Sequence, residues 1–195
     1  MSLVGLIAQA DECGLAASGL ACLDRCVPLL GGDDDEVLRP LWASLADDGI
    51  DDWGTRLEQA RGKLDSAGRE EYADDEAVLL ARRMLAAAPA ERAAAEARVW
   101  ADACSVASLQ IHRLLDLTDD DASLDARRAG RTEGTPPLVA AELRRQVAVL
   151  ELLAGHGASG LHRALEVSTE GRRVLRAVVS RRARARGRAP ARGRG

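Results

Sequence analysis

The 195-residue sequence predicts an all-α fold, and three observations support this prediction. Apolar residues recur at helical spacing in several segments, and acidic pairs precede some of these segments, where they would help a helix to start. No segment alternates apolar and polar residues as a strand would, and no repeat with a period of 20–50 residues is found. We therefore expect a bundle of about six or seven helices.

The segment Pro89–Leu117 is expected to form the central helix of this bundle. Its small and apolar residues follow a 4-3-4-3-4-3 spacing, which places them on one stripe: Ala93, Ala97, Trp100, Cys104, Ala107, Ile111 and Leu114. Pro89 suits the first helical position, and the helix would be about 43 Å long at 1.5 Å per residue. Because most stripe residues are Ala or Cys, neighbouring helices can approach closely.

Upstream of the central helix, the sequence predicts four helices in order. Residues Ser2–Val27 are apolar on nearly every side, which indicates a buried helix, ended by Pro28 and by Gly31 with Gly32. A short helix over Pro40–Ala46 follows the acidic run at 33–36. Asp51 and Asp52 precede a helix with Trp53, Leu57, Ala60 and Leu64 on one face, and Asp74 and Asp75 precede a helix that ends near Ala88.

Downstream of the central helix, the pattern breaks and then resumes. Residues Thr118–Pro137 have few large apolar residues, which indicates a loop or linker, and the chain forms either one bundle or two subdomains split there. We expect one helix from Thr135 to about Ala154, stopped by Gly155. A second helix is expected from Ser159 to about residue 180, with a break near Gly171. The expected organisation is a helical domain over 1–180 and a disordered basic tail over 181–195.

Charge is distributed very unevenly along the chain. The segment Arg172–Gly195 contains 10 arginines and no acidic residue, whereas the other 171 residues carry 17 basic and 31 acidic groups. The whole chain contains 26 arginines and one lysine, with no phenylalanine and no asparagine. This composition is typical of translation from GC-rich DNA and suggests a GC-rich bacterial source. Codon bias can therefore account for part of the arginine content.

The arginine-rich segment is the strongest candidate binding surface. Such segments bind phosphate backbones in a salt-dependent way, so nucleic acid is one candidate partner. Contact with an acidic protein, with a second copy or with an anionic membrane surface remains open, as does compositional drift without a partner. Because this segment has no aromatic residue, sequence-specific reading of single strands is disfavoured. The candidate residues are Arg172, Arg173, Arg176, Arg181, Arg182, Arg184, Arg186, Arg188, Arg192 and Arg194.

A glycine-rich turn at 155–160 is a weaker candidate site. The letters GHGASG match the G-x-G-x-x-G dinucleotide fingerprint, but that fingerprint needs a preceding strand, and here a helix precedes it. A tight turn between two helices is therefore favoured. His156, Ser159 and His162 are kept as candidates for a small-molecule site, with His156 and His162 as a conceivable proton-transfer pair.

Cysteines and acidic runs do not indicate a metal or cofactor. Cys13, Cys22, Cys26 and Cys104 lack the paired spacing of zinc sites, so we expect buried thiols that behave as small apolar groups. The acidic runs at 33–35 and 119–121 lack the aromatic cavity that surrounds Mg²⁺–diphosphate sites. No catalytic residue, metal or cofactor is therefore assigned.

The sequence gives no sign of a leader segment or a membrane span. The first residues lack a basic region, and Asp11 and Glu12 interrupt the apolar run, so a cytoplasmic location is expected. The expected function is that of a non-catalytic interaction or scaffold protein that binds a protein partner or itself through helix faces. The alternatives are a nucleic-acid-associated protein that uses the arginines, and a regulator or enzyme with a site near His156–His162.

Overall fold

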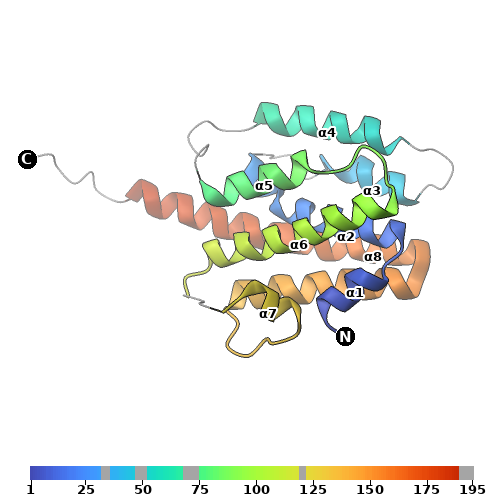
Figure 1. Cartoon of the computed structure of the whole chain (residues 1–195). Helices are drawn as coiled ribbons and strands as arrows, with labels where there is room; N and C mark the ends of the chain where they lie inside the picture. Colours follow the sequence, from blue (N-terminus) through green and yellow to red (C-terminus); the bar gives the residue numbers. More distant parts are fainter. Residues whose placement is uncertain (32–35, 47–51, 68–74, 119–121, 189–195) are drawn as a thin grey trace, which may run out of the picture.

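The computed structural model describes residues 1–31, 36–46, 52–67, 75–118 and 122–188, and the prediction of an all-α fold is confirmed. The described residues form eight α-helices and one 3₁₀-helix, without a strand (Figure 1). The elements are α1 (Leu3–Gln9), α2 (Glu12–Cys26), η1 (Val27–Leu30), α3 (Arg39–Ala46), α4 (Trp53–Ala67), α5 (Glu76–Ala86), α6 (Ala94–Leu115), α7 (Leu124–Arg128) and α8 (Pro137–Arg188).

The first predicted helix, Ser2–Val27, is divided into α1 and α2. The break occurs at Asp11, whose Oδ1 accepts a hydrogen bond from the Gly14 amide at 2.7 Å and so caps the start of α2. In a continuous helix, the Gly14 amide would donate to a backbone carbonyl. Here the Asp11 carboxylate accepts its hydrogen bond instead. As predicted, the apolar run ends at Gly31, whose positive φ of 79° favours glycine.

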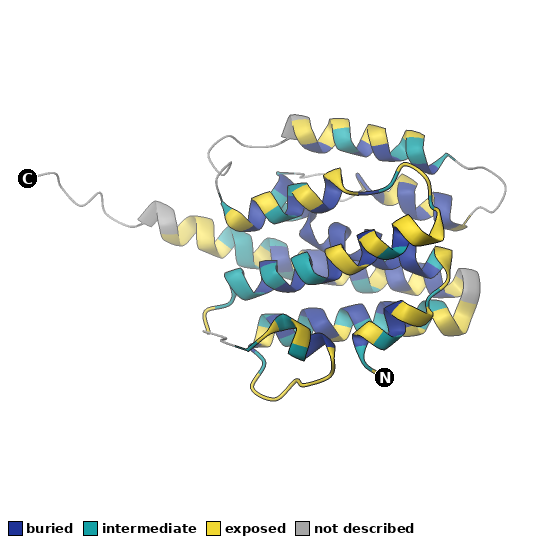
Figure 2. Cartoon of the chain, in the orientation of Figure 1, coloured by how far each residue is buried: buried dark blue, intermediate teal, exposed yellow. Residues whose placement is uncertain are grey.

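Helix α2 lies in the middle of the bundle, between α6 and α8, and every residue from Gly14 to Cys26 is buried (Figures 1 and 2). The window Glu12–Leu30 is long and apolar enough to cross a membrane by length and composition alone, which was not expected from the sequence. Because 83% of that window is buried inside the fold, packing against neighbouring helices accounts for its apolar character.

The central helix α6 starts at Ala94, five residues later than predicted, and Pro89 lies in the turn before it. The predicted stripe faces the core where the helix is formed, since Ala97, Trp100, Cys104 and Ile111 are all buried. The buried face is wider than the stripe, however. It also includes the polar residues Ser105, Ser108 and His112.

Helices α3, α4 and α5 occur where the sequence predicts them. Asp75 caps α5 by accepting a hydrogen bond from the Ala77 amide at 3.0 Å. Trp53 at the start of α4 donates its indole N–H to the Pro89 carbonyl at 2.8 Å, which ties α4 to the turn before α6. The acidic residues predicted to help start helices at 33–35, 51 and 74 lie outside the described residues.

The segment Thr118–Pro137 is not wholly a loop, since it contains the short helix α7. Helices on both sides of the segment pack together, because α8 contacts α1, α2 and α6. Asp116, at the end of α6, accepts a hydrogen bond from the Leu138 amide at 2.8 Å and so caps the start of α8. The acidic run at 119–121 lies outside the described residues.

Helix α8 folds back on itself, so that its two limbs lie side by side (Figure 1). Its Glu142 and Arg172 bond to Arg25 and Asp24, which are adjacent in α2, whereas in a straight helix they would be about 45 Å apart. The bend coincides with the glycine-rich turn that the sequence predicts. A Cβ at Gly160 would lie 2.4 Å from the Leu152 carbonyl oxygen, so the close approach of the two limbs requires glycine.

The C-terminal part of α8 differs from the prediction in two ways. Gly171 does not break the helix, and a Cβ at this position would lie 2.4 Å from Cδ of Arg25, so the close contact with α2 favours glycine. Residues 181–188, expected to be disordered, continue α8 as helix. The last residues, 189–195, lie outside the described residues.

Candidate functional site

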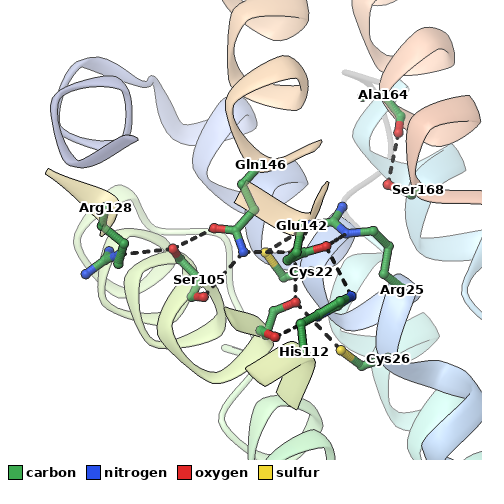
Figure 3. A network of polar contacts seen from close by, with 11 residues as sticks. Cys22, Arg25, Cys26, Ser105, His112, Arg128, Glu142, Gln146, Ala164 and Ser168 are labelled. Carbon is green, nitrogen blue, oxygen red and sulfur yellow. Dashed lines mark hydrogen bonds and ion pairs between the residues drawn. The ribbon is translucent and has the colours of Figure 1, made fainter. Parts of the chain in front are cut away.

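The most extensive group of buried polar side chains lies between α2, α6, α7 and α8 (Figure 3). We call this group the polar core, and its centre is the carboxylate of Glu142, which is 0% exposed. Its members are Arg25, Ser105, Ser108, His112, Arg128, Glu142 and Gln146. None of them was among the sequence candidates.

Arg25 and Glu142 form a bidentate ion pair across the α2–α8 contact. Arg25 Nε donates to Glu142 Oε2 at 2.8 Å, and Arg25 Nη2 donates to Oε1 at 2.6 Å. Both side chains are 0% exposed. The parallel N–H groups of the guanidinium match the two carboxylate oxygens, which is the strongest geometry available to such a pair.

Further donors complete the shell around Glu142 and extend it to α7. Glu142 Oε1 accepts hydrogen bonds from Ser108 Oγ at 2.8 Å and from Gln146 Nε2 at 2.9 Å. Gln146 Oε1 accepts from Ser105 Oγ at 2.7 Å, and Arg128 Nε donates to the same Ser105 oxygen at 3.2 Å. The chain of bonds therefore joins three helices to α8.

His112 contacts the other side of the same carboxylate. Its Nδ1 lies 2.7 Å from the Ser108 carbonyl oxygen, and its Nε2 lies 3.6 Å from Glu142 Oε2. Because a carbonyl can only accept, Nδ1 carries the proton in the neutral ring. Burial lowers the pKa of His112, and this outweighs the opposing attraction of Glu142.

The charge state of Glu142 follows from its donors. Burial alone would raise the pKa of this carboxyl, but the charge and hydrogen bonds of Arg25, with help from His112 and Gln146, lower the pKa to about 2. Glu142 also raises the pKa of Arg25 above its ordinary value, against the effect of burial. Both partners are therefore charged at neutral pH.

A second buried ion pair joins α2 to the other limb of α8. Arg172 Nη1 donates to Asp24 Oδ1 at 2.6 Å, and the two side chains are 6% and 1% exposed. This corrects the prediction that Arg172 contacts an anionic partner, because its side chain is buried. Burial raises the pKa of Asp24 to about 6, although Arg172 and Arg25 act to lower it.

The cysteines confirm the expectation of buried, apolar-like thiols at three of four positions, since Cys22, Cys26 and Cys104 are all buried. Burial raises the pKa of the Cys22 thiol to about 12, despite the nearby charge of Arg25, and it also raises the pKa values of Cys26 and Cys104. These thiols are protonated at neutral pH. They therefore lack the thiolate that nucleophilic or redox chemistry requires.

We expect only the half-buried Cys13 to react quickly with a disulfide reagent such as dithionitrobenzoate in the folded protein at pH 8. The buried thiols should react slower by a factor on the order of 1,000, because they must wait for local or global unfolding. Stopped-flow absorbance measures the phases of the reaction, and in urea all four thiols of the chain should react. Cys13→Ser serves as the control and should remove the fast phase; two or more fast thiols in the folded chain would contradict the structure.

The polar core joins α2, α6 and α7 to α8 through buried side chains. Its central ion pair makes no contact with solvent, and its hydrogen bonds run mostly between its own members. The sequence did contain signals of it. Arg25 interrupts a strongly apolar segment, and Glu142 and Gln146 are four residues apart on the first limb of α8, where the neighbouring inward residues, such as Val139, Leu143 and Leu150, are apolar.

The structure does not bring the histidine candidates into a site. His156, Ser159 and His162 are exposed around the bend of α8. Ser159 Oγ donates to the His156 carbonyl at 2.8 Å, and His156 Nδ1 lies 3.3 Å from the Leu152 carbonyl oxygen, so both side chains bond to local backbone. His162 lies 3.5 Å from the exposed carboxylate of Glu166, one helical turn away.

The remaining arginine candidates divide into exposed residues and residues that are not described in detail. Arg173, Arg181, Arg182 and Arg184 are exposed on α8, and Arg176 is half-buried. Arg182 Nη1 donates to the Leu114 carbonyl at 2.8 Å and so caps the end of α6. Arg186 and Arg188 lie within the last turns of α8, and Arg192 and Arg194 lie outside the described residues.

The pockets lined by described residues include two near other parts of the bundle. The larger, of about 490 Å³, is open to solvent between α4 and α5, and its lining combines Leu64 and Leu85 with Arg61, Asp65 and Arg82. Arg61 already donates to the Ala86 and Ala88 carbonyls at the end of α5. The smaller, of about 30 Å³, lies beside Asp24 and Arg172 and has room for little more than a water molecule.

Among the described residues, no group of three or more His, Cys, Asp and Glu side chains is arranged to hold a metal ion. Comparison of the chain with protein-family models, with curated proteins and with solved structures found no match. The function is therefore inferred from the surfaces of this chain alone.

Proposed function

We propose that this chain is a non-catalytic interaction protein, in which a helical body presents the arginine-rich end of α8 to an anionic macromolecule. The observation that carries this proposal is the basic arm, residues 181–188 of α8, which extends past the ends of α5 and α6 (Figure 1). Its residues 181–185 are exposed, and three of these five are arginine. No acidic residue follows Glu170 in the sequence.

The arm is attached to the body by specific contacts, which supports a defined rather than a random display of its charge. Arg182 caps the end of α6, and Leu175 is buried in the core less than two helical turns before the arm begins. A helix held at its base keeps its arginines in a fixed arrangement. The arm therefore loses less conformational entropy on binding than an unfolded tail would lose.

The features inside the body support a binding role over a catalytic one. The polar core makes its hydrogen bonds mostly between its own members, and the three buried thiols are held protonated. The candidate histidines bond to local backbone or to a neighbouring carboxylate. The feature available to a large partner is therefore the charge of the exposed arginines on α8.

Replacing Arg173, Arg181 and Arg184 with Gln in the full chain should weaken binding to heparin, used as a generic polyanion. Affinity at about 0.1 M salt should fall on the order of tenfold to a hundredfold. The slope of log affinity against log salt concentration should fall in magnitude by about 3, because three contacts are lost. The measurement is isothermal titration across a salt series.

The matched control replaces Arg83, Arg131 and Arg144, which are three exposed arginines on the body, with Gln. This control removes the same net charge and should bind heparin nearly as well as the unchanged chain. Equal losses in the two variants, or no binding by the unchanged chain, would contradict the proposed function.

A further inference from the structure

We propose that the partner of the basic arm is the phosphate backbone of a duplex nucleic acid, contacted without reading base sequence by a helical stripe that consists of Arg181 and Arg184 in the arm and Arg173 eight residues before Arg181. This inference rests on the proposed function and names the class of partner. It depends on three features of the structure: the placement of the arginines, the lack of large exposed apolar side chains around them in the described part of α8, and the change of charge sign along α8.

The three arginines lie on one side of the helix. At about 100° per residue they fall within a sector of about 80°, and Arg173 and Arg184 are about 17 Å apart along the axis. All three are exposed. Arg181 Nε donates to the Ala177 carbonyl at 3.2 Å, which leaves its Nη groups outside that bond. Within the described residues, Arg173 and Arg184 form no hydrogen bond or ion pair.

This spacing suits a regular array of phosphates. A duplex presents one phosphate per about 3.4 Å of axis on each strand, so the stripe spans about five phosphates of one strand. A guanidinium can bond two phosphate oxygens at once, which gives each contact a defined geometry. The stripe is therefore long enough for its three arginines to contact separate phosphates of one strand.

The surroundings of the stripe disfavour a membrane and an ordinary protein interface. A helix on a membrane needs a large apolar face, but Leu175 is buried and Val178 and Val179 already pack against the core. From Ser180 onward the apolar residues of the chain are alanine and proline alone. Protein interfaces usually contain aromatic or large aliphatic anchors beside arginine, and the arm has none.

The absence of aromatic side chains in the arm also favours a duplex over a single strand as the partner. Proteins that hold single strands without sequence preference stack bases on aromatic rings. Because the arm lacks such rings, its contacts are limited to charge and hydrogen bonding. A duplex has the higher phosphate density and is the target that such contacts favour.

A change of charge sign along α8 limits where the duplex can lie. Glu166 and Glu170 are exposed on the same side of the helix as the stripe, on the side nearer to the bend. Their carboxylates repel phosphates, so the duplex is confined to the segment from Arg173 toward the free end. The strongly acidic remainder of the chain adds to this repulsion.

The first test measures binding of the full chain to a fluorescent 20-base-pair DNA duplex of mixed sequence, in a salt series. An RNA duplex of the same sequence distinguishes the two sources of phosphate backbone. Polyglutamate and vesicles with phosphatidylserine represent the other partner classes. We expect duplex binding that is independent of sequence, weakens steeply with salt, and falls at least tenfold in the Arg173, Arg181 and Arg184 variant. Polyglutamate or vesicles bound as tightly as either duplex would overturn the inference.

The heparin measurement separates the two proposals. If the chain binds heparin through the arm but binds neither duplex, the partner class is wrong and the proposed function stands. If heparin binding does not depend on the arm, both proposals fail. Each result therefore has a distinct meaning.

Two variants that keep all the arginines test the geometry itself. Glu170→Gln should raise duplex affinity about twofold to fivefold by removing a like charge beside the stripe, whereas Glu96→Gln, in the first turn of α6, should leave it unchanged. Ala183→Pro should interrupt the helix within the arm and lower affinity several-fold. Unchanged affinity in both Glu170→Gln and Ala183→Pro would show that unstructured charge is sufficient, and would overturn the stripe.

Discussion

Glu142→Gln is expected to lower the free energy of unfolding by about 3–5 kcal/mol at pH 7, because it leaves the Arg25 charge buried without its counter-ion. Both partners are 0% exposed in the folded chain, so water cannot replace the lost carboxylate oxygen. Urea unfolding followed by circular dichroism measures the change. The loss should appear as a lower midpoint urea concentration, with little change in the slope of the unfolding free energy against urea concentration.

A surface ion pair provides the matched control for this substitution. Arg39 Nη1 donates to Glu36 Oε2 at 2.6 Å, a similar distance, but the two side chains are 64% and 57% exposed. Glu36→Gln should therefore change stability by less than about 1 kcal/mol. A loss in Glu142→Gln no larger than the loss in Glu36→Gln would contradict the structural role of the polar core.

A double substitution separates the energy of the pair from the cost of breaking it. Replacing Arg25 with Met and Glu142 with Leu together removes both charges and roughly keeps the volume. We expect the double variant to be more stable than Glu142→Gln, because no charge is left buried without a partner. Some loss should remain, since Ser108 and Gln146 would then lose the Glu142 carboxylate as an acceptor.

The same pair predicts how stability depends on pH. The pKa of Glu142 is lowered from an ordinary 4.5 to about 2 in the folded chain, so its contribution is present above pH 4.5 and is lost as pH falls toward 2. The pKa of Asp24 is raised from 3.8 to about 6, so its protonation favours the folded state between those values. The difference between the unchanged chain and Glu142→Gln should therefore shrink mainly below pH 4.5.

Gly19→Ala is expected to destabilise the fold by about 1–3 kcal/mol, because α2 and α6 approach too closely for a methyl group. A Cβ at Gly19 would lie 2.6 Å from Cε3 of Trp100. That ring cannot move easily, because its indole N–H donates to the Met84 carbonyl at 2.9 Å and its edge packs against Trp53. Urea unfolding measures the loss, and tryptophan fluorescence reports the shift of the ring.

A second glycine distinguishes this clash from a general effect of glycine substitution. A methyl group added at Gly62, inside α4, would meet no neighbouring atom within 4 Å. Gly62→Ala should therefore stabilise the chain by about 0.5–1 kcal/mol through helix propensity. In a Trp100→Phe background, Gly19→Ala should cost less, because the smaller ring leaves room. Equal behaviour of the two glycines would contradict the packing of α2 on α6.

Local signals explain why much of the fold could be predicted from the sequence. The spacing of Trp53, Leu57 and Leu64 defines the inward face of α4, and the Asp75 carboxylate defines where α5 begins. Both features depend on residues within one or two helical turns. The start of α2 at Asp11 has the same kind of signal, and it was missed because the apolar pattern continues on both sides of it.

Pairings between distant segments could not be predicted in this way. Arg25 and Glu142 are 117 positions apart, and nothing in the sequence around either residue identifies the other. The burial of Arg172 was missed for the same reason, because it depends on Asp24, 148 positions away. A run of arginines suggests a uniform surface, whereas three-dimensional packing divides it into a buried member, a cap for α6 and an exposed stripe.

The attachment of adjacent residues of α2 to both limbs of α8 has a consequence for synthesis of the chain. Asp24 and Arg25 leave the ribosome well before their counter-ions, Arg172 and Glu142, which follow 148 and 117 positions later in the chain. Until both are available, α2 cannot enter the bundle without burying uncompensated charge. The nascent chain therefore completes its core only after Arg172 has been made, and a product that stops before Arg172 is left as a substrate for proteolysis.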